Sequence, residues 1–229
     1  MRKAAVAFGV TPETAPDIEA AYHETMAELD AHFAAHPYLL GGAPTIGDYG
    51  LFAALYPHLG RDPHPLRLMQ GKAQMLLRWT ERMRNPSSDM VEFIGRDESL
   101  LGDDAIPKTL KVLLARVASD YLPEIEAMMA FTNDWLAENN PEPNEVVGGE
   151  SLARGIGMCK FNWRGLNINT VVMPYRIFML QRIQDAYDAL EVPARQAVDA
   201  LLSETGLSTL VTSRCSRRVE RENHREIWR

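Results

Sequence analysis

The chain has 229 residues, a formal net charge of −7 and a hydrophobic fraction of 46%. This length and apolar content are enough for a hydrophobic core and exclude a chain that is disordered throughout. Because negative charge repels phosphate backbones and anionic lipids, we expect no nucleic acid and no membrane as a partner. No apolar run approaches the roughly 20 residues of a membrane-spanning helix, so a cytoplasmic location is expected.

Cysteine and histidine usage gives no sign of a metal or redox centre. Cys159 and Cys215 are far apart and form neither a Cys-x-x-Cys pair nor a zinc-ligand spacing. His32 and His36 are four residues apart on an expected helix, but no third ligand accompanies them. We therefore expect packed or solvated histidines and no metal site.

The first clear helix is expected over residues 17–36. Pro16 and Asp17 suit a first helical turn, and apolar side chains then recur at steps of three and four residues. Pro37 should end this helix, because a proline disfavours helical geometry in the residue before it. A tight bend with two glycines follows.

Thr45 and Asp48 predict the start of a second helix. Thr-x-x-Asp is a variant of the capping box, in which a residue at the cap and another three positions later satisfy free backbone N–H groups. The helix should continue through Tyr56 until Pro57 breaks it. Because Thr45 and Asp48 satisfy helix-end donors, we expect them to act in folding rather than in chemistry.

The rest of the chain also favours helices. Further helices are expected at 68–83, 107–139, 174–190 and 193–205. Pro123 should kink or divide the second of these. A small hairpin around Arg164 and Gly165 fits residues 158–169, and the arginines and glutamates after Ser213 favour a solvated helix with i,i+4 pairs.

The predicted fold class is therefore all-α, with a small β-hairpin near 158–169. Residues 1–85 are expected to form a helical core. Residues 86–229 are expected to form a helical extension packed on that core, within one continuous domain.

Two motifs surround the double-glycine bend. Tyr38-Leu39-Leu40-Gly41-Gly42 ends one helix, and Pro44-Thr45-Ile46-Gly47-Asp48-Tyr49 opens the next. This order of an amphipathic helix, a glycine turn and a capped central helix resembles the C-terminal helical domain of the glutathione S-transferase superfamily, over about residues 17–85. The segment 174–182 is similar, more weakly, to the extended C-terminal region of some bacterial members.

The resemblance implies that the complete protein conjugates glutathione to a small apolar electrophile, or reduces such a compound with glutathione. In this family a thioredoxin-like domain holds glutathione, so this co-substrate is not expected to bind the chain alone and no catalytic residue is assigned. The helices would supply the wall of the electrophile pocket. The candidate substrate-binding residues are Tyr49, Phe52, Tyr56, His58 and Arg61. Simple core packing of Phe52 and Tyr56 is the competing interpretation.

No thioredoxin-like pattern precedes Ile18. We therefore expect Met1 to be an internal methionine of a longer protein, and loss of the catalytic half is the alternative. The implied partners are a thioredoxin-like domain or partner protein and, as an open question, a second copy of the chain.

Two other functions remain open. The chain could be a non-catalytic helical interaction or scaffold module, since one fold serves many functions. Alternatively, the C-terminal half could hold an anion pocket. The residues considered for that pocket are Trp163, Arg164, Arg176, Gln181, Arg182 and Asp185, although the three-residue spacing of Arg182 and Asp185 favours a surface ion pair.

Overall fold

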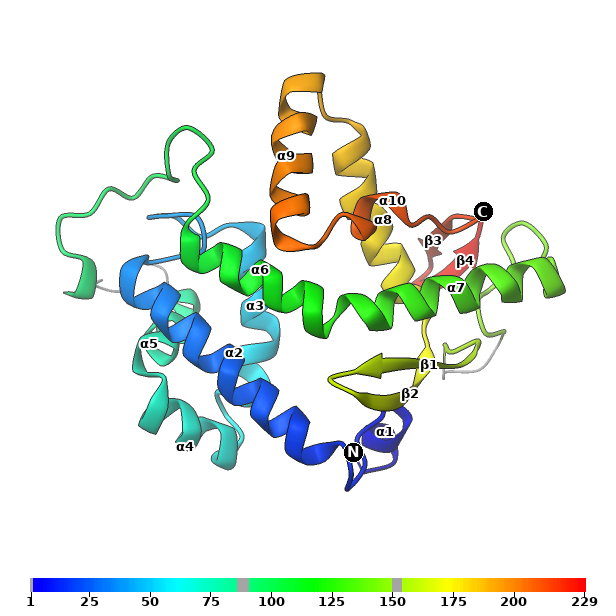
Figure 1. Ribbon diagram of the computed structural model, residues 1–229, viewed down its shortest axis with the longest axis horizontal. Coiled ribbons are helices and arrows are strands. Elements are labelled where there is room, and N and C mark those ends of the chain that lie inside the picture. Colours follow the sequence, from blue (N-terminus) through cyan, green and yellow to red (C-terminus); the bar gives the residue numbers. More distant parts are fainter. Residues whose placement is uncertain (1, 86–90, 150–153) are drawn as a thin grey trace. The chain divides into compact units, whose positions relative to one another are not determined.

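The computed structural model describes residues 2–85, 91–149 and 154–229, and most of them are helical (Figure 1). Two small antiparallel strand pairs accompany the helices. The predicted all-α class with a small hairpin is thus confirmed, and the second strand pair was not expected. No helix in the described part of the chain is long and apolar enough to cross a membrane.

The chain divides into two compact units. One unit comprises residues 19–114, and the other comprises residues 1–18 together with 115–229. The boundary on the C-terminal side falls inside helix α6, which spans Lys108–Asp120. The expected division of the chain at residue 85 stays a prediction.

The first unit contains helices around one hydrophobic core. Besides the beginning of α6, its elements are α2 (Ala15–Ala35), α3 (Ile46–Ala54), η1 (Leu55–Leu59), α4 (Pro63–Lys72), α5 (Gln74–Arg84) and the short η2 (Val91–Phe93). In the core, the ring of Phe33 stacks on Trp79 with 4.6 Å between centroids, and Phe52 meets the same indole edge-on. Phe33 and Trp79 are fully buried, so α2 and α5 are held together by aromatic packing.

One predicted helix is divided in two. We expected a helix over 68–83, but Ala73 has φ −144° and separates α4 from α5. Asp30 of α2 explains the interruption, because its Oδ1 accepts the N–H groups of Met75 and Leu76 at 2.7 and 3.1 Å. A carboxylate from another helix therefore caps α5, which the local periodicity did not reveal.

The double-glycine bend packs closely against the segment 97–101. Gly41 has φ +120°, and a Cβ on Gly42 would lie 1.9 Å from the carbonyl oxygen of Asp97. The N–H of Gly42 donates to the Ser99 carbonyl at 2.8 Å. Glycine is required here because no side chain fits between the two backbones.

The second unit contains the remaining elements. They are α1 (Arg2–Ala7), the end of α6, α7 (Leu122–Asn139), β1 (Gly157–Trp163), β2 (Leu166–Val172), α8 (Pro174–Asp188), α9 (Val192–Thr205), α10 (Thr209–Thr212), β3 (Val219–Glu222) and β4 (Arg225–Trp228). Pro123 lies in the first turn of α7, and the predicted helix 107–139 is indeed divided there. The hairpin turns at Arg164 and Gly165, as predicted, with φ +53° and +83°.

The arginine-rich tail is a hairpin, so the prediction of a solvated helix was wrong. Val219 pairs with Trp228 across the two strands, and Asn223 and His224 form the turn with φ +47° and +65°. Val219 and Trp228 are buried, and this burial outweighs the weak i,i+4 charge pairs that a helix would offer. The arginines and glutamates face each other across strands, as in the pair Arg229–Glu220 at 3.2 Å.

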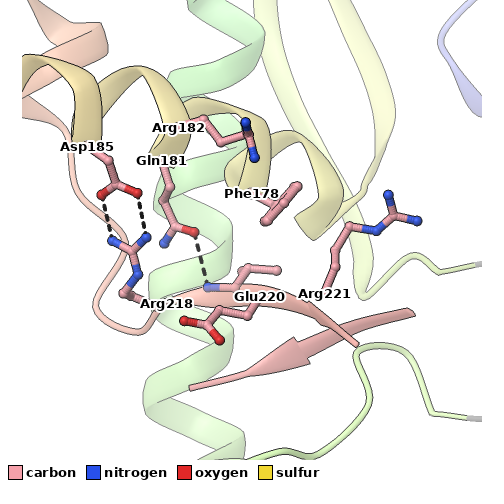
Figure 2. Close-up of a pocket in the computed structure, with 8 residues that line it drawn as sticks. Phe178, Gln181, Arg182, Asp185, Arg218, Glu220 and Arg221 are labelled. Atoms are coloured by element: carbon pink, nitrogen blue, oxygen red, sulfur yellow. Dashed lines mark hydrogen bonds and ion pairs between the residues drawn. The ribbon is translucent and has the colours of Figure 1, made fainter. Parts of the chain in front are cut away.

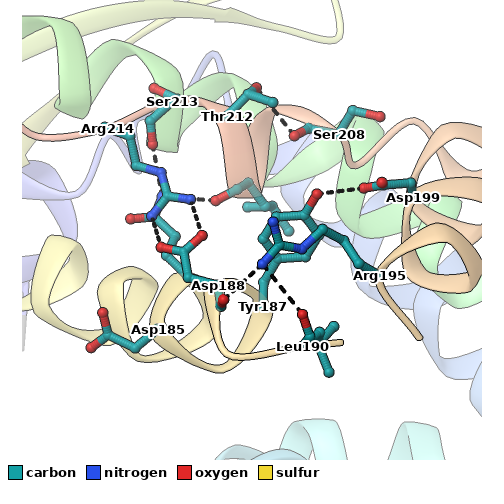
Figure 3. A network of polar contacts seen from close by, with 12 residues as sticks. Asp185, Tyr187, Asp188, Leu190, Arg195, Asp199, Ser208, Thr212, Ser213 and Arg214 are labelled. Carbon is teal, nitrogen blue, oxygen red and sulfur yellow. Dashed lines mark hydrogen bonds and ion pairs between the residues drawn. The ribbon is translucent and has the colours of Figure 1, made fainter. Parts of the chain in front are cut away.

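A polar network joins α8, α9 and the segment after α10 (Figure 3). Arg214 donates two hydrogen bonds to Asp188 at 2.9 and 2.8 Å. The Tyr187 hydroxyl donates to Asp199 at 2.6 Å, and Arg195 donates to the Asp188 carbonyl at 2.7 Å. These bonds fix the turn between α8 and α9.

Candidate functional site

The candidate site of the first unit lies where η1 meets α4 and α5. Pro57 lacks an N–H group and therefore cannot continue a regular α-helix. The chain instead forms a wider π turn, in which the N–H of Gly60 donates to the Leu55 carbonyl at 2.5 Å. A Cβ on Gly60 would lie 2.9 Å from that same carbonyl oxygen. The turn brings Tyr56 and Arg61 to one side of the unit.

Asp48 anchors the helix that carries this turn. Its Oδ1 accepts hydrogen bonds from the Leu39 N–H at 3.0 Å and the Trp79 indole at 3.2 Å. Its Oδ2 accepts the N–H and hydroxyl of Thr45 at 2.9 and 2.8 Å. Asp48 is fully buried, so four donors enclose this carboxylate and tie α3 to α5.

A pocket of about 440 Å³ opens beside the π turn. Tyr56, Gly60 and Arg61 form one wall of it. The other walls come from α4 and α5 and consist of Leu66, Gln70, Leu77, Thr80, Glu81 and Arg84. The pocket thus combines an aromatic ring and two leucines with five polar or charged side chains, so its lining offers both apolar contacts and hydrogen bonds to a small molecule.

Two arginines approach the ring of Tyr56. The guanidinium carbon of Arg61 lies 5.8 Å from the ring centroid, and that of Arg84 lies 5.9 Å from it. Neither arginine has an ion pair within the part of the chain that the structure describes. Glu81 is occupied by Arg78 at 2.6 Å, so the pocket carries a local excess of positive charge.

The structure brings some of the predicted substrate-binding residues together and separates others. Tyr56 and Arg61 line the pocket, and Phe52 stacks behind Tyr56 with 4.9 Å between ring centroids. Tyr49 is 54% exposed on the outside of α3, and His58 is exposed without lining the pocket. The assignment of all five to a substrate site stays a prediction.

The residues that α5 contributes to the pocket were not predicted from the sequence. Leu77 and Arg84 come from that helix, more than twenty residues after Tyr56 in the sequence. The amphipathic pattern of α5 indicated a buried face, but no local signal said that its edge would meet η1.

The two cysteines do not fit the role of a glutathione-activating group. Burial raises the pKa of Cys159, and the nearby charge of Glu124 raises it further. Burial also raises the pKa of Cys215. Both therefore stay thiols near neutral pH, whereas thiol chemistry requires the thiolate.

The first unit is an all-helical domain with a capped central helix and an aromatic pocket at its edge. Residues 12–82 match the family described as Glutathione S-transferase, C-terminal domain, so this part of the chain is similar to domains of that kind. The match covers about a third of the chain and includes Thr45, Asp48 and most of the pocket. No curated protein and no solved structure matches the chain.

Proposed function

We propose that this chain is the electrophile-binding part of a glutathione S-transferase-like protein. The observation that carries the proposal is the pocket beside Tyr56, which lies in the domain that matches this family apart from Arg84 at its edge. A flat electrophile would stack on Tyr56 and contact Leu66 and Leu77. Arg61 and Arg84 would donate to its nitro or carbonyl oxygens, so that electron-poor ligands are favoured.

The glutathione chemistry would lie outside these residues. A thioredoxin-like domain, in the same polypeptide or on a partner protein, would supply the thiolate, and conjugation or reduction of the electrophile would follow there. The same assembly could include a second copy of the chain, and we propose that it works in the cytoplasm. Glutathione is therefore a co-substrate of the complete assembly.

The binding part of the proposal can be tested on the chain alone with dinitrobenzene, a flat uncharged nitroaromatic without a leaving group. Isothermal titration should detect binding, and Arg84→Gln should weaken it about fivefold. Arg67→Gln is a matched control, because Arg67 is an exposed arginine of α4 outside the pocket. Equal affinity in wild type and Arg84→Gln, or no binding at all, would refute the electrophile pocket.

A second experiment addresses the location of the glutathione site. The chain should pass through a column of immobilised glutathione without retention. Retention that free glutathione reverses would show that these residues hold the tripeptide themselves. The proposal of an external thioredoxin-like domain would then be wrong.

An interaction module is the second candidate function. Ile46 is 89% exposed and Tyr49 is 54% exposed, both at the beginning of α3. These two side chains lie three residues apart on one helix and offer a partner a small apolar contact surface. If dinitrobenzene does not bind, the interaction module becomes the favoured function of the domain.

A further inference from the structure

The second unit contains a separate pocket of about 320 Å³ between α8 and β3 (Figure 2). It is lined by Phe178, Gln181, Arg182, Asp185, Arg218, Val219, Glu220 and Arg221. Gln181, Arg182 and Asp185 were among the residues considered for an anion pocket from the sequence. Arg164 and Arg176 were also considered, but they pair elsewhere, with Asp120 and Glu124.

The walls of this pocket are fixed by hydrogen bonds. The N–H of Val219 donates to Oε1 of Gln181 at 3.2 Å, and both residues are buried. Arg218 donates to both carboxylate oxygens of Asp185 at 2.9 and 2.7 Å. These contacts join α8 to β3 and fix the positions of the pocket walls relative to each other.

The carboxylates at the pocket are already occupied. Asp185 is held by Arg218, and its hydrogen bonds, together with the nearby charge of Arg182, keep the pKa of this carboxyl below its ordinary value. Glu220 accepts a hydrogen bond from Arg229 at 3.2 Å. Arg182 has no ion pair within the described residues, so its charge is available to a ligand.

Arg221 adds to the positive charge. It shares the buried carboxylate of Glu226 with Arg154, so one negative charge faces two guanidinium groups. Arg182 and Arg221 lie on either side of Phe178 (Figure 2). The ring of Phe178 is half-buried and stacks on Tyr175 with 6.1 Å between centroids.

We propose that this pocket binds a small aromatic anion, with its ring on Phe178 and its phosphate or carboxylate between Arg182 and Arg221. The ring supplies stacking area, and the guanidinium groups supply charge-assisted hydrogen bonds that hold the acid group. The pocket is independent of the electrophile site, because it is built from residues of the other unit. Aryl phosphates and aryl carboxylates share this chemistry.

Phenyl phosphate is a suitable probe, titrated into the full chain and followed by calorimetry. Arg182→Gln should weaken binding at least fivefold, and it should fold normally because Arg182 is exposed and has no ion pair within the described residues. Phe178→Leu keeps an apolar side chain but removes the ring, and should weaken binding about threefold. Inorganic phosphate should bind at least fivefold more weakly than phenyl phosphate.

Arg84→Gln separates the two pockets, because it removes a cation only from the electrophile site. Phenyl phosphate should bind this variant within about twofold of wild type. The proposal is overturned if Arg182→Gln leaves the affinity for phenyl phosphate unchanged or if Arg84→Gln abolishes binding. It is also overturned if inorganic phosphate binds as tightly as phenyl phosphate, or if phenyl phosphate does not bind. None of these results depends on dinitrobenzene, which is uncharged, so the two proposals can fail separately.

Discussion

Replacement of Asp48 tests the packing on which the first unit depends. In Asp48→Ala, the Trp79 indole N–H loses its acceptor at 3.2 Å and stays buried, because Trp79 has no exposed surface. An unsatisfied buried donor costs about 1–3 kcal/mol, and loss of a helix cap costs about 0.5–2 kcal/mol. Since these contributions share one side chain and do not simply add, we expect a loss of about 3 kcal/mol in the free energy of unfolding.

Thr45→Ala provides the comparison. It removes one hydroxyl donor, while the backbone N–H of residue 45 keeps its bond to Asp48. Thr45 is half-buried, so water can replace part of the loss, and we expect about 1 kcal/mol. The effect of Asp48→Ala should therefore be about three times larger.

Urea denaturation followed by circular dichroism measures both changes. Hydrogen exchange of peptides from α3 and α5 assigns the loss to the first unit, because the chain has two units and need not unfold in one step. A loss below about 1 kcal/mol in Asp48→Ala would refute the reasoning. Equal losses in the two variants would also refute it, because the additional donors would then contribute nothing.

Two further predictions concern the buried basic side chains Arg82 and His32. Arg82 is 1% exposed, and its Nη2 donates to the Pro37 carbonyl at 2.9 Å. Its Nη1 lies 3.7 Å from a Glu92 carboxylate oxygen, but neither Nη1 nor Nε has a hydrogen-bond partner among the described residues. Arg82→Met should therefore lower the free energy of unfolding, measured by urea denaturation, by less than about 2 kcal/mol. Arg82→Ala also leaves a cavity and should lower it by about 3–5 kcal/mol. Similar losses in the two variants would contradict this prediction. Burial lowers the pKa of His32, so stability should be complete above its ordinary pKa of about 6.5 and fall as the pH decreases below it. Urea denaturation at about pH 7.5 and about pH 5.5 measures this loss, and the free energy of unfolding should fall less in His32→Gln than in wild type. Part of the fall should remain, because burial also lowers the pKa of His36. An identical fall in the two proteins would show that His32 does not cause the pH dependence.

The parts of the fold that the sequence predicted correctly have strong local signals. Thr45 and Asp48 mark a helix start by their spacing. Pro123 marks a division, because a proline disrupts the interior of any helix. The hairpin at Arg164 and Gly165 follows from a glycine between two alternating segments. Each of these signals is contained within a few neighbouring residues.

The parts that were missed depend on contacts between distant segments. The cap of α5 comes from Asp30, more than forty residues earlier in the chain. The terminal hairpin, by contrast, does have a local sequence signal. Asn223 tolerates positive φ and stands between the apolar residues Val219 and Trp228. The regular spacing of arginines hid that turn. The same limitation left Arg84 outside the predicted site, because only tertiary packing brings it to Tyr56.

The π turn at Leu55–Leu59 makes the length of the chain at this point important. A wide turn contains one residue more than a regular turn of α-helix, and each residue rotates the helix by about 100°. Deletion of a single residue there would rotate Arg61 by about 100° relative to α3 and turn it away from the face that carries Tyr56. A change of chain length at this turn would therefore alter the lining of the pocket while leaving the buried carboxylate of Asp48 and its four donors intact.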